Sequence, residues 1–202
     1  MKAAKLRVLE NRQVSERYWH MVVDAAELPD EVKPGQFFNV RCADEIYPLL
    51  RRPFSIYKIN KRERTLEFLY LVKGVGTQRL TEIRAGEKAD VFGPLGTGFN
   101  LDAEDGAMLM LARGVGIATL AALAQEAAEK GVRSVAVLSA RSRNDLLAAE
   151  TLESYGAKVY KVTDEEGNSD VASVGKLLEG IFREENITAA YTCGSKRLAE
   201  LL

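Results

Sequence analysis

The sequence predicts a six-stranded antiparallel β-barrel followed by an α/β domain with a parallel sheet. All five prolines and 11 of the 15 aromatic residues precede residue 100, and such residues suit antiparallel strands joined by turns. Of the 25 alanines, 18 follow residue 100, where they suit helices packed on a sheet. Strand-like and helix-like segments also alternate in that second half. We therefore expect two domains, 1–100 and 101–202, joined near 100–105.

The first domain is expected to contain six short strands. Segments rich in β-branched and aromatic residues recur, and turn residues such as Pro34-Gly35 and Ala85-Gly86 lie between them. Six strands at this spacing are typical of a small closed barrel or a sandwich. The expected strands are 5–14, 18–25, 35–41, 54–60, 66–72 and 88–93.

The second domain is expected to alternate strands with helices. The segment 117–131 has apolar residues at helical spacing and ends on Gly131, which suits the position after a helix. Such alternation predicts a parallel sheet with helices on both faces, and ligands bind at the carboxyl ends of its strands. The expected strands are 107–112, 134–140, 157–162 and 189–194, so the binding loops are those after Leu111, Ser139, Val162 and Thr192.

Composition excludes several classes of protein. The formal net charge of −1 argues against nucleic acid as the main partner. Two cysteines, Cys42 and Cys193, are too few for a disulfide scaffold or for an all-cysteine metal or iron–sulfur site within this chain, and one histidine, His20, excludes most histidine-based zinc sites. No apolar run reaches the ~20 residues of a membrane span, and the first ten residues lack a signal peptide's apolar core. We therefore expect a cytoplasmic protein.

Two segments of the first domain suit an anionic ligand. The run Arg51–Ile56 presents a cation and a hydroxyl beside a proline-stiffened strand. Further on, a strand ends in Gly74-Val75-Gly76-Thr77 and is expected to turn into a short helix over 78–83. Backbone amides at such a turn, together with Thr77, can hold a phosphate. Arg52 can supply the opposite charge.

In this order, the segments resemble the ferredoxin–NADP reductase superfamily, most closely the electron-transfer subunits of dihydroorotate dehydrogenase and related sulfide dehydrogenase-like flavoproteins. The resemblance covers essentially the whole chain. Four segments match motifs of this superfamily. They are an Arg-Pro-x-Ser motif at Arg52, Pro53, Phe54 and Ser55; a flavin-lining strand at Leu69, Tyr70 and Leu71; a Gly-x-Gly-Thr turn at Gly74, Gly76 and Thr77; and the end-of-barrel run Gly93–Phe99.

The resemblance implies that the barrel binds FAD. Ser55 would lie near the reactive nitrogen of the flavin and is a catalytic candidate. Phe54 stands where many superfamily members have a tyrosine that stacks on the flavin ring. The turn from Gly74 to Thr77 would hold the pyrophosphate.

The second domain would bind NAD or NADP, although its first loop departs from the family pattern. Gly114, Val115 and Gly116 keep the helix-start amides, but Arg113 replaces a usual glycine and Thr119 replaces a usual proline. Arg113 can either help to bind an anion or block close approach of the nucleotide, and the sequence leaves both open.

Three later loops complete the expected nucleotide site. Arg141 and Ser142 match the loop that faces the adenosine half, and Asp164 is the favoured contact in the acidic loop after the third strand. Cys193 and Gly194 match the superfamily's Cys-Gly motif. The resemblance places Cys193 near the nicotinamide–flavin junction, as a second catalytic candidate.

The resemblance implies an oxidoreductase subunit that transfers hydride between NAD(P)H and FAD and passes electrons to an iron–sulfur partner. That partner would be an iron–sulfur or flavoprotein catalytic subunit or a ferredoxin, within a hetero-oligomer. Relatives hold a 2Fe-2S cluster with cysteines near the C-terminus, so a cluster is expected only in a missing C-terminal tail or in the partner. The alternative is an FAD-holding module that has lost productive NAD(P)H binding, which Arg113 and Thr119 motivate.

Overall fold

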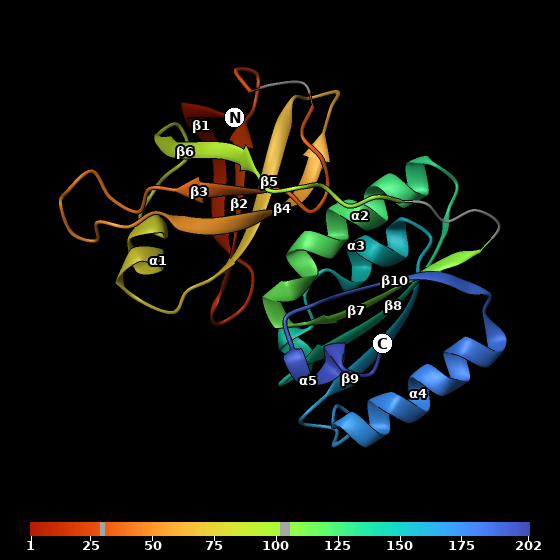
Figure 1. Cartoon of the computed structure of the whole chain (residues 1–202). Coiled ribbons are helices and arrows are strands. Elements are labelled where there is room, and N and C mark those ends of the chain that lie inside the picture. Colours follow the sequence, from red (N-terminus) through yellow and green to blue (C-terminus); the bar gives the residue numbers. More distant parts are fainter. Residues whose placement is uncertain (29–30, 102–105) are drawn as a thin grey trace. The chain divides into compact units, whose positions relative to one another are not determined.

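The computed structural model describes residues 1–28, 31–101 and 106–202. The chain divides into two compact units, Met1–Phe99 and Asn100–Leu202 (Figure 1). Most of the junction expected at 100–105 lies outside the described residues. No helix in the described ranges is long and apolar enough to cross a membrane.

The N-terminal unit is a closed antiparallel barrel with the strand order β1-β2-β5-β4-β3-β6. This confirms the predicted barrel and removes the sandwich alternative. The strands are β1 (Lys2–Gln13), β2 (Tyr18–Asp24), β3 (Phe37–Val40), β4 (Arg52–Asn60), β5 (Thr65–Leu71) and β6 (Lys88–Leu95).

The barrel interior is filled by alternate residues of the strands, as the two-residue period of a strand requires. Val8 and Val23 lie opposite each other on β1 and β2, and both are fully buried. Phe38 and Phe68 meet edge to face, with ring centroids 5.8 Å apart. This apolar core fixes which side chains of β4 and β5 point outward.

A short helix, α1 (Val75–Leu80), follows β5 and begins three residues earlier than the sequence predicts. The Thr77 hydroxyl accepts hydrogen bonds from the backbone amides of Lys73, at 2.9 Å, and Gly74, at 3.2 Å. It also donates to the Gly74 carbonyl at 3.0 Å. Thr77 therefore closes the first turn around Gly74, and the helix begins there rather than at Gln78.

The C-terminal unit is a parallel sheet with the order β10-β7-β8-β9. Figure 1 shows α2 and α3 on one face and α4 and α5 on the other, which confirms the predicted architecture. The elements are β7 (Ala107–Arg113), η1 (Gly114–Gly116), α2 (Ile117–Glu129), β8 (Arg133–Ala140), η2 (Arg143–Asp145), α3 (Ala149–Ser154), β9 (Lys158–Thr163), α4 (Val171–Glu184), β10 (Ile187–Cys193) and α5 (Lys196–Ala199).

The sheet order identifies where a ligand can enter. The chain runs from β7 to β8 and β9 on one side, then returns to place β10 on the other side of β7. Beneath the sheet, Leu109 and Leu111 pack against Val174 and Leu178 of α4. In open α/β sheets, ligands bind outside the carboxyl ends of the strands where the order reverses. That crevice lies at the ends of β7 and β10.

Candidate functional site

Arg52 lies against the turn that begins α1. Its Nη1 donates to the carbonyls of Leu50, at 2.6 Å, and Arg51, at 3.3 Å. A Cβ at Gly76 would lie 3.2 Å from both Nε and Nη2 of Arg52, and 3.0 Å from the Cys42 Sγ. Glycine at 76 therefore lets the guanidinium pack on the turn, so the fold brings together two residues that the sequence predicts as one site.

Gly74 leaves open space at the start of the same turn. A Cβ there would meet no atom of the described residues within 4 Å. The Thr77 hydroxyl, by contrast, is already bonded within the turn. The geometry leaves space at Gly74 for an incoming group, while Thr77 holds the turn in shape by bonding the Gly74 amide and carbonyl. Direct contact between Thr77 and a ligand stays a prediction.

Phe54 and Ser55 face opposite sides of β4. Phe54 is 7% exposed, and its ring stacks on Tyr70 with centroids 5.0 Å apart and planes at 15°. Ser55 is half-buried and pairs with Phe37 of β3. Ser55 therefore stands on the outer face, whereas Phe54 already has an aromatic partner inside the barrel. The stacking of Phe54 on a flavin stays a prediction.

Leu69 and Tyr70 are buried, and Leu71 is half-buried. The Tyr70 hydroxyl donates to the Asn11 Oδ1 at 3.0 Å, and burial raises the pKa of Tyr70. The Asn11 amide donates in turn to the carbonyls of Leu80, at 2.8 Å, and Ile83, at 2.9 Å. Asn11 thus ties β5 to the end of α1. Sequence reasoning missed it, because one asparagine in a strand carries no signal of its distant partners.

The crevice at the ends of β7 and β10 is built on close backbone contact. A Cβ at Gly116 would lie 2.4 Å from the Cys193 carbonyl oxygen. A Cβ at Gly194 would lie 2.2 Å from the Arg113 carbonyl oxygen, and Gly194 has a φ of +102°. Only glycine fits at these two positions. The fold therefore brings four predicted residues together: Gly114, Gly116, Cys193 and Gly194.

The remaining predicted residues of this crevice differ in accessibility. Val115 is half-buried, whereas Thr119 is buried within α2. The Cys193 side chain is half-buried, and burial raises the pKa of its thiol. Cys193 is therefore a neutral thiol near pH 7.

Arg113 crosses the sheet edge in the direction away from β10. Its Nη1 donates to the Ser139 Oγ at 2.6 Å, and its Nη2 lies 2.7 Å from the Asp164 Oδ2. Asp164 also accepts a hydrogen bond from the Ser169 hydroxyl. The bonds from Ser169 and Arg113 together hold the pKa of the Asp164 carboxyl below its usual value. Asp164 is therefore ionised. Arg113 already binds the carboxylate that the sequence predicts as a contact of the nucleotide.

The loop after β8 carries the other predicted contacts. Arg141 is exposed, and its charge contributes to the lowered pKa of Asp164. The Ser142 Oγ lies 3.3 Å from the Asp145 Oδ2. Arg143 forms an ion pair with Glu166 of the next loop. The loops after β8 and β9 are therefore joined by charge pairs.

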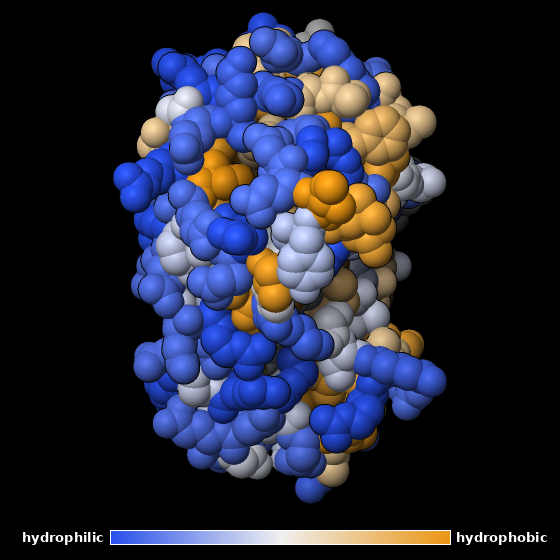
Figure 2. All heavy atoms as spheres, turned by 90° about the vertical axis from the view of Figure 1, so that its left-hand side faces the viewer, coloured by the Kyte–Doolittle hydropathy of each residue, from blue (hydrophilic) through white to orange (hydrophobic). Residues whose placement is uncertain are grey.

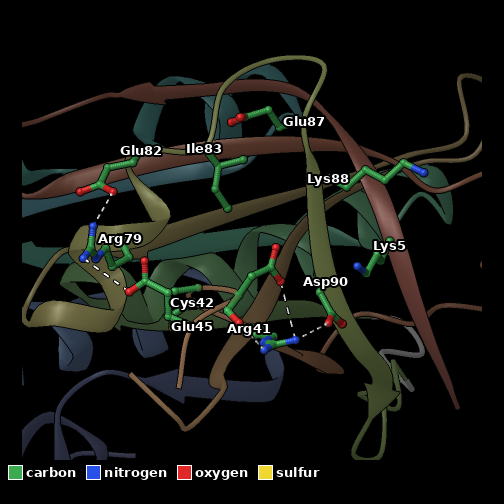
Figure 3. Close-up of a pocket in the computed structure, with 12 residues that line it drawn as sticks. Lys5, Arg41, Cys42, Glu45, Arg79, Glu82, Ile83, Glu87, Lys88 and Asp90 are labelled. Carbon is green, nitrogen blue, oxygen red and sulfur yellow. Dashed lines mark hydrogen bonds and ion pairs between the residues drawn. The ribbon is translucent and has the colours of Figure 1, made fainter. Parts of the chain in front are cut away.

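The barrel also has a hollow of about 630 Å³ that the sequence did not predict. Figure 3 shows Arg79 between Glu82 and Glu45, and Arg41 directed toward Asp90. Four cations and five carboxylates line the hollow, so it presents only a small excess of negative charge. None of the predicted flavin contacts lines it.

The loop between β3 and β4 exposes large apolar side chains. The exposed fractions are 87% for Ile46, 69% for Tyr47, 74% for Leu49 and 69% for Leu50. Figure 2 shows apolar patches amid a largely hydrophilic surface on the side where this loop and α1 lie in Figure 1.

Among the described residues, no group of three or more His, Cys, Asp or Glu is arranged to hold a metal.

Solved structures define the class of fold. An NADH-dependent reduced ferredoxin-NADP oxidoreductase matches with a TM-score of 0.81 and 24% identity, over 96% of this chain and 69% of that chain. The ferredoxin-NADP⁺ reductase of Plasmodium falciparum matches with a TM-score of 0.79 and 11% identity, over 98% and 88%. The chain therefore has the fold of the ferredoxin–NADP reductases.

Sequence relatives give the family within this class. The electron transfer subunit of dihydroorotate dehydrogenase B (NAD(+)) from Lysinibacillus sphaericus is 31% identical over 192 residues, which are 94% of this chain and 73% of the relative. The corresponding subunit of Geobacillus thermodenitrificans is 30% identical over 201 residues, 98% of this chain and 77% of the relative. No family model matches. The chain belongs to the family of dihydroorotate dehydrogenase B electron transfer subunits.

Proposed function

We propose that this chain carries electrons between NAD(H) and an iron–sulfur partner through bound FAD. The unit 1–99 would hold FAD, and the unit 100–202 would hold the nicotinamide nucleotide. The observation that carries the proposal is the packing of the Arg52 guanidinium on Gly76, in the turn where Gly74 leaves open space. That arrangement suits a pyrophosphate, and it occurs in a chain of a flavin-linked electron transfer family.

The residues of the barrel fit FAD. Arg52 offers Nε and Nη2 beside the turn, and Gly74 leaves room for close approach. The Ser55 hydroxyl stands on the outer face of β4, where it can hydrogen-bond the flavin ring. FAD held there would supply the chemistry that links two-electron hydride transfer to single-electron transfer. The chain's own task is to orient the ring and to keep water away from it.

The crevice at β7 and β10 fits the nicotinamide nucleotide. Gly116 and Gly194 allow backbone contact, and Cys193 lines the crevice as a neutral thiol. No proton donor is required, because hydride transfer moves the proton with its electrons. Cys193 therefore serves as a small side chain that leaves room for the nicotinamide.

Charges at the sheet edge favour NAD(H) over NADP(H). Arg113 is paired with Asp164, and Arg143 is paired with Glu166. The edge formed by Arg113 and the segments 141–145 and 164–166 carries three arginines against four carboxylates. An additional 2′-phosphate would meet a net negative edge, which opposes its binding. The name of the relatives also specifies NAD(+).

We also propose an iron–sulfur or flavoprotein catalytic subunit as the partner in the cytoplasm. The apolar β3–β4 loop leads directly into Arg52–Ser55, so a subunit that covers Leu49 and Leu50 would lie close to the flavin. Co-expression with a catalytic subunit, followed by sedimentation analysis, tests this. Leu49→Asp should weaken the complex, and Phe182→Asp, a matched change on α4, should not.

Reconstitution tests the flavin assignment. The purified chain should bind FAD and show the visible absorbance of a bound flavin. Arg52→Ala should raise the Kd for FAD roughly ten-fold or more, because one charge-assisted bond to the pyrophosphate is lost. A wild-type chain that binds no FAD after reconstitution contradicts the proposal.

The alternative function is a flavin-holding module that does not use NAD(H). The position of Arg113 at the ends of β7, β8 and β9 favours this alternative, because a large side chain beside the crevice can block close approach of the nucleotide. Anaerobic mixing with NADH separates the two functions. Bleaching of the flavin supports the reductase, and an unchanged flavin spectrum supports the module.

A further inference from the structure

We propose that Arg113 binds the pyrophosphate of the incoming nucleotide by exchanging partners, so that Nη2 leaves Asp164 and pairs with a phosphate oxygen. Asp164 is then the internal competitor that sets nucleotide affinity. The inference rests on the proposed function, since it concerns the same nucleotide crevice. Arg113, which stands where the family has a glycine, is then the principal contact of the anion.

The backbone of Arg113 is held in place, so only its side chain can move. Arg113 pairs with Ser139 in the parallel ladder between β7 and β8. Its carbonyl packs under Gly194, where a Cβ would come within 2.2 Å. The guanidinium therefore swings about a fixed point beside the crevice. Its side chain is 22% exposed, so solvent and ligands can reach it.

The exchange breaks one contact and retains the others. Ser139 Oγ can keep Nη1 while Nη2 turns from Asp164 toward the crevice. Asp164 keeps its hydrogen bond with the Ser169 hydroxyl, and half of its side chain is exposed to water. Water can therefore solvate the carboxylate that Arg113 leaves. The cost of opening is that of one partly exposed ion pair, which is small.

Electrostatics gives the exchange its direction. A pyrophosphate brings two negative charges to an edge where Asp164 is already ionised. With Arg113 absent, that carboxylate would repel the phosphates; with Asp164 neutral, Arg113 would meet them without a competitor. The two residues should therefore have opposite effects on affinity, whereas a steric barrier would be relieved by removing Arg113.

Isothermal titration calorimetry of the FAD-loaded full chain tests the partner exchange of Arg113 with two probes that cannot transfer hydride. ADP-ribose carries the pyrophosphate, and adenosine does not. Arg113→Ala should raise the Kd for ADP-ribose roughly ten-fold, the equivalent of one charged hydrogen bond. Asp164→Asn should lower it about three-fold, because an amide holds the guanidinium less strongly. Both variants should bind adenosine as the wild type does.

Two further variants keep the test decisive. Arg113→Lys retains the charge without the planar fork and should bind ADP-ribose with intermediate affinity. Arg183→Ala removes the same charge from an exposed position on α4 and should leave binding unchanged. If Arg113→Ala binds ADP-ribose as tightly as the wild type, or more tightly, the exchange is wrong. If the wild type itself does not bind ADP-ribose, the proposed function fails as well.

Discussion

The Tyr70 hydroxyl donates a 3.0 Å hydrogen bond to the Asn11 Oδ1, across 59 residues of sequence. Through the two bonds of its amide, Asn11 also holds the carbonyl of Leu80, the last residue of α1, and that of Ile83 just beyond the helix. Because α1 begins at the Gly74–Thr77 turn, this buried pair supports the proposed pyrophosphate site from behind.

Replacing Asn11 should therefore loosen the flavin site and destabilise the barrel. Asn11→Ala leaves the buried Tyr70 hydroxyl and two carbonyls without these partners, at a cost of about 1–3 kcal/mol. Urea unfolding followed by fluorescence of Trp19, the single tryptophan of the chain, measures the loss. Tyr70→Phe keeps the ring stacked on Phe54 and should cost less. Equal stability of Asn11→Ala and the wild type would contradict this role.

A methyl group at Gly76 should displace Arg52. Gly76→Ala places a Cβ 3.2 Å from two atoms of the guanidinium and 3.0 Å from the Cys42 Sγ. We expect the Kd for FAD to rise roughly ten-fold, as one charged contact is lost, when measured by flavin fluorescence. Gly180→Ala on α4 is the matched control, since its Cβ meets no described atom within 4 Å. A normal FAD affinity in Gly76→Ala would separate Arg52 from the site.

The barrel should lose stability in acid through Glu67. Burial opposes its ionisation, but the hydrogen bond from His20 at 2.7 Å and the charge of Lys58 outweigh burial and lower the pKa of Glu67. A folded pKa below the unfolded value, about 4.3, gives stability that is present above that value. This stability is lost as the pH falls through the folded pKa.

Glu67→Gln should remove this dependence. At pH 7 the variant should be less stable than the wild type by roughly 1.5–3 kcal/mol, the range for a hydrogen bond to a charged group. The difference should shrink as the pH falls below 4. Unfolding of both proteins across this range, followed by Trp19 fluorescence, checks the sign. A difference that is constant with pH would show that Glu67 does not titrate as described.

Cys193 should react slowly with alkylating reagents. Burial raises the pKa of its thiol, and only the thiolate is a strong nucleophile. At pH 7.5 iodoacetamide should modify Cys193 more slowly than free cysteine, and NADH should slow it further by covering the crevice. Peptide mass spectrometry follows the modification. Rapid modification that NADH does not affect would place Cys193 away from the nucleotide.

The sequence predicts local features well and long-range partners poorly. The distributions of proline, aromatic residues and alanine predict both domains. The strands and helices can be predicted because their periods appear in residues that are close in sequence. Helix α1 begins earlier than predicted because the Thr77 hydroxyl bonds back to the Gly74 carbonyl. Composition does not predict such a side-chain hydrogen bond. Arg113 meets Asp164 across 51 residues, and Phe54 on β4 stacks on Tyr70 of the neighbouring strand β5. Such partners depend on register, which one sequence does not specify.

Anaerobic stopped-flow mixing of the FAD-loaded chain with NADH tests the central claim most directly. We predict rapid loss of the visible flavin absorbance, at a rate that saturates with NADH, and a slower reaction with NADPH because of the negative sheet edge. The absorbance should return when a one-electron acceptor is added. A flavin that is bound but keeps its full absorbance with both nucleotides would contradict the account.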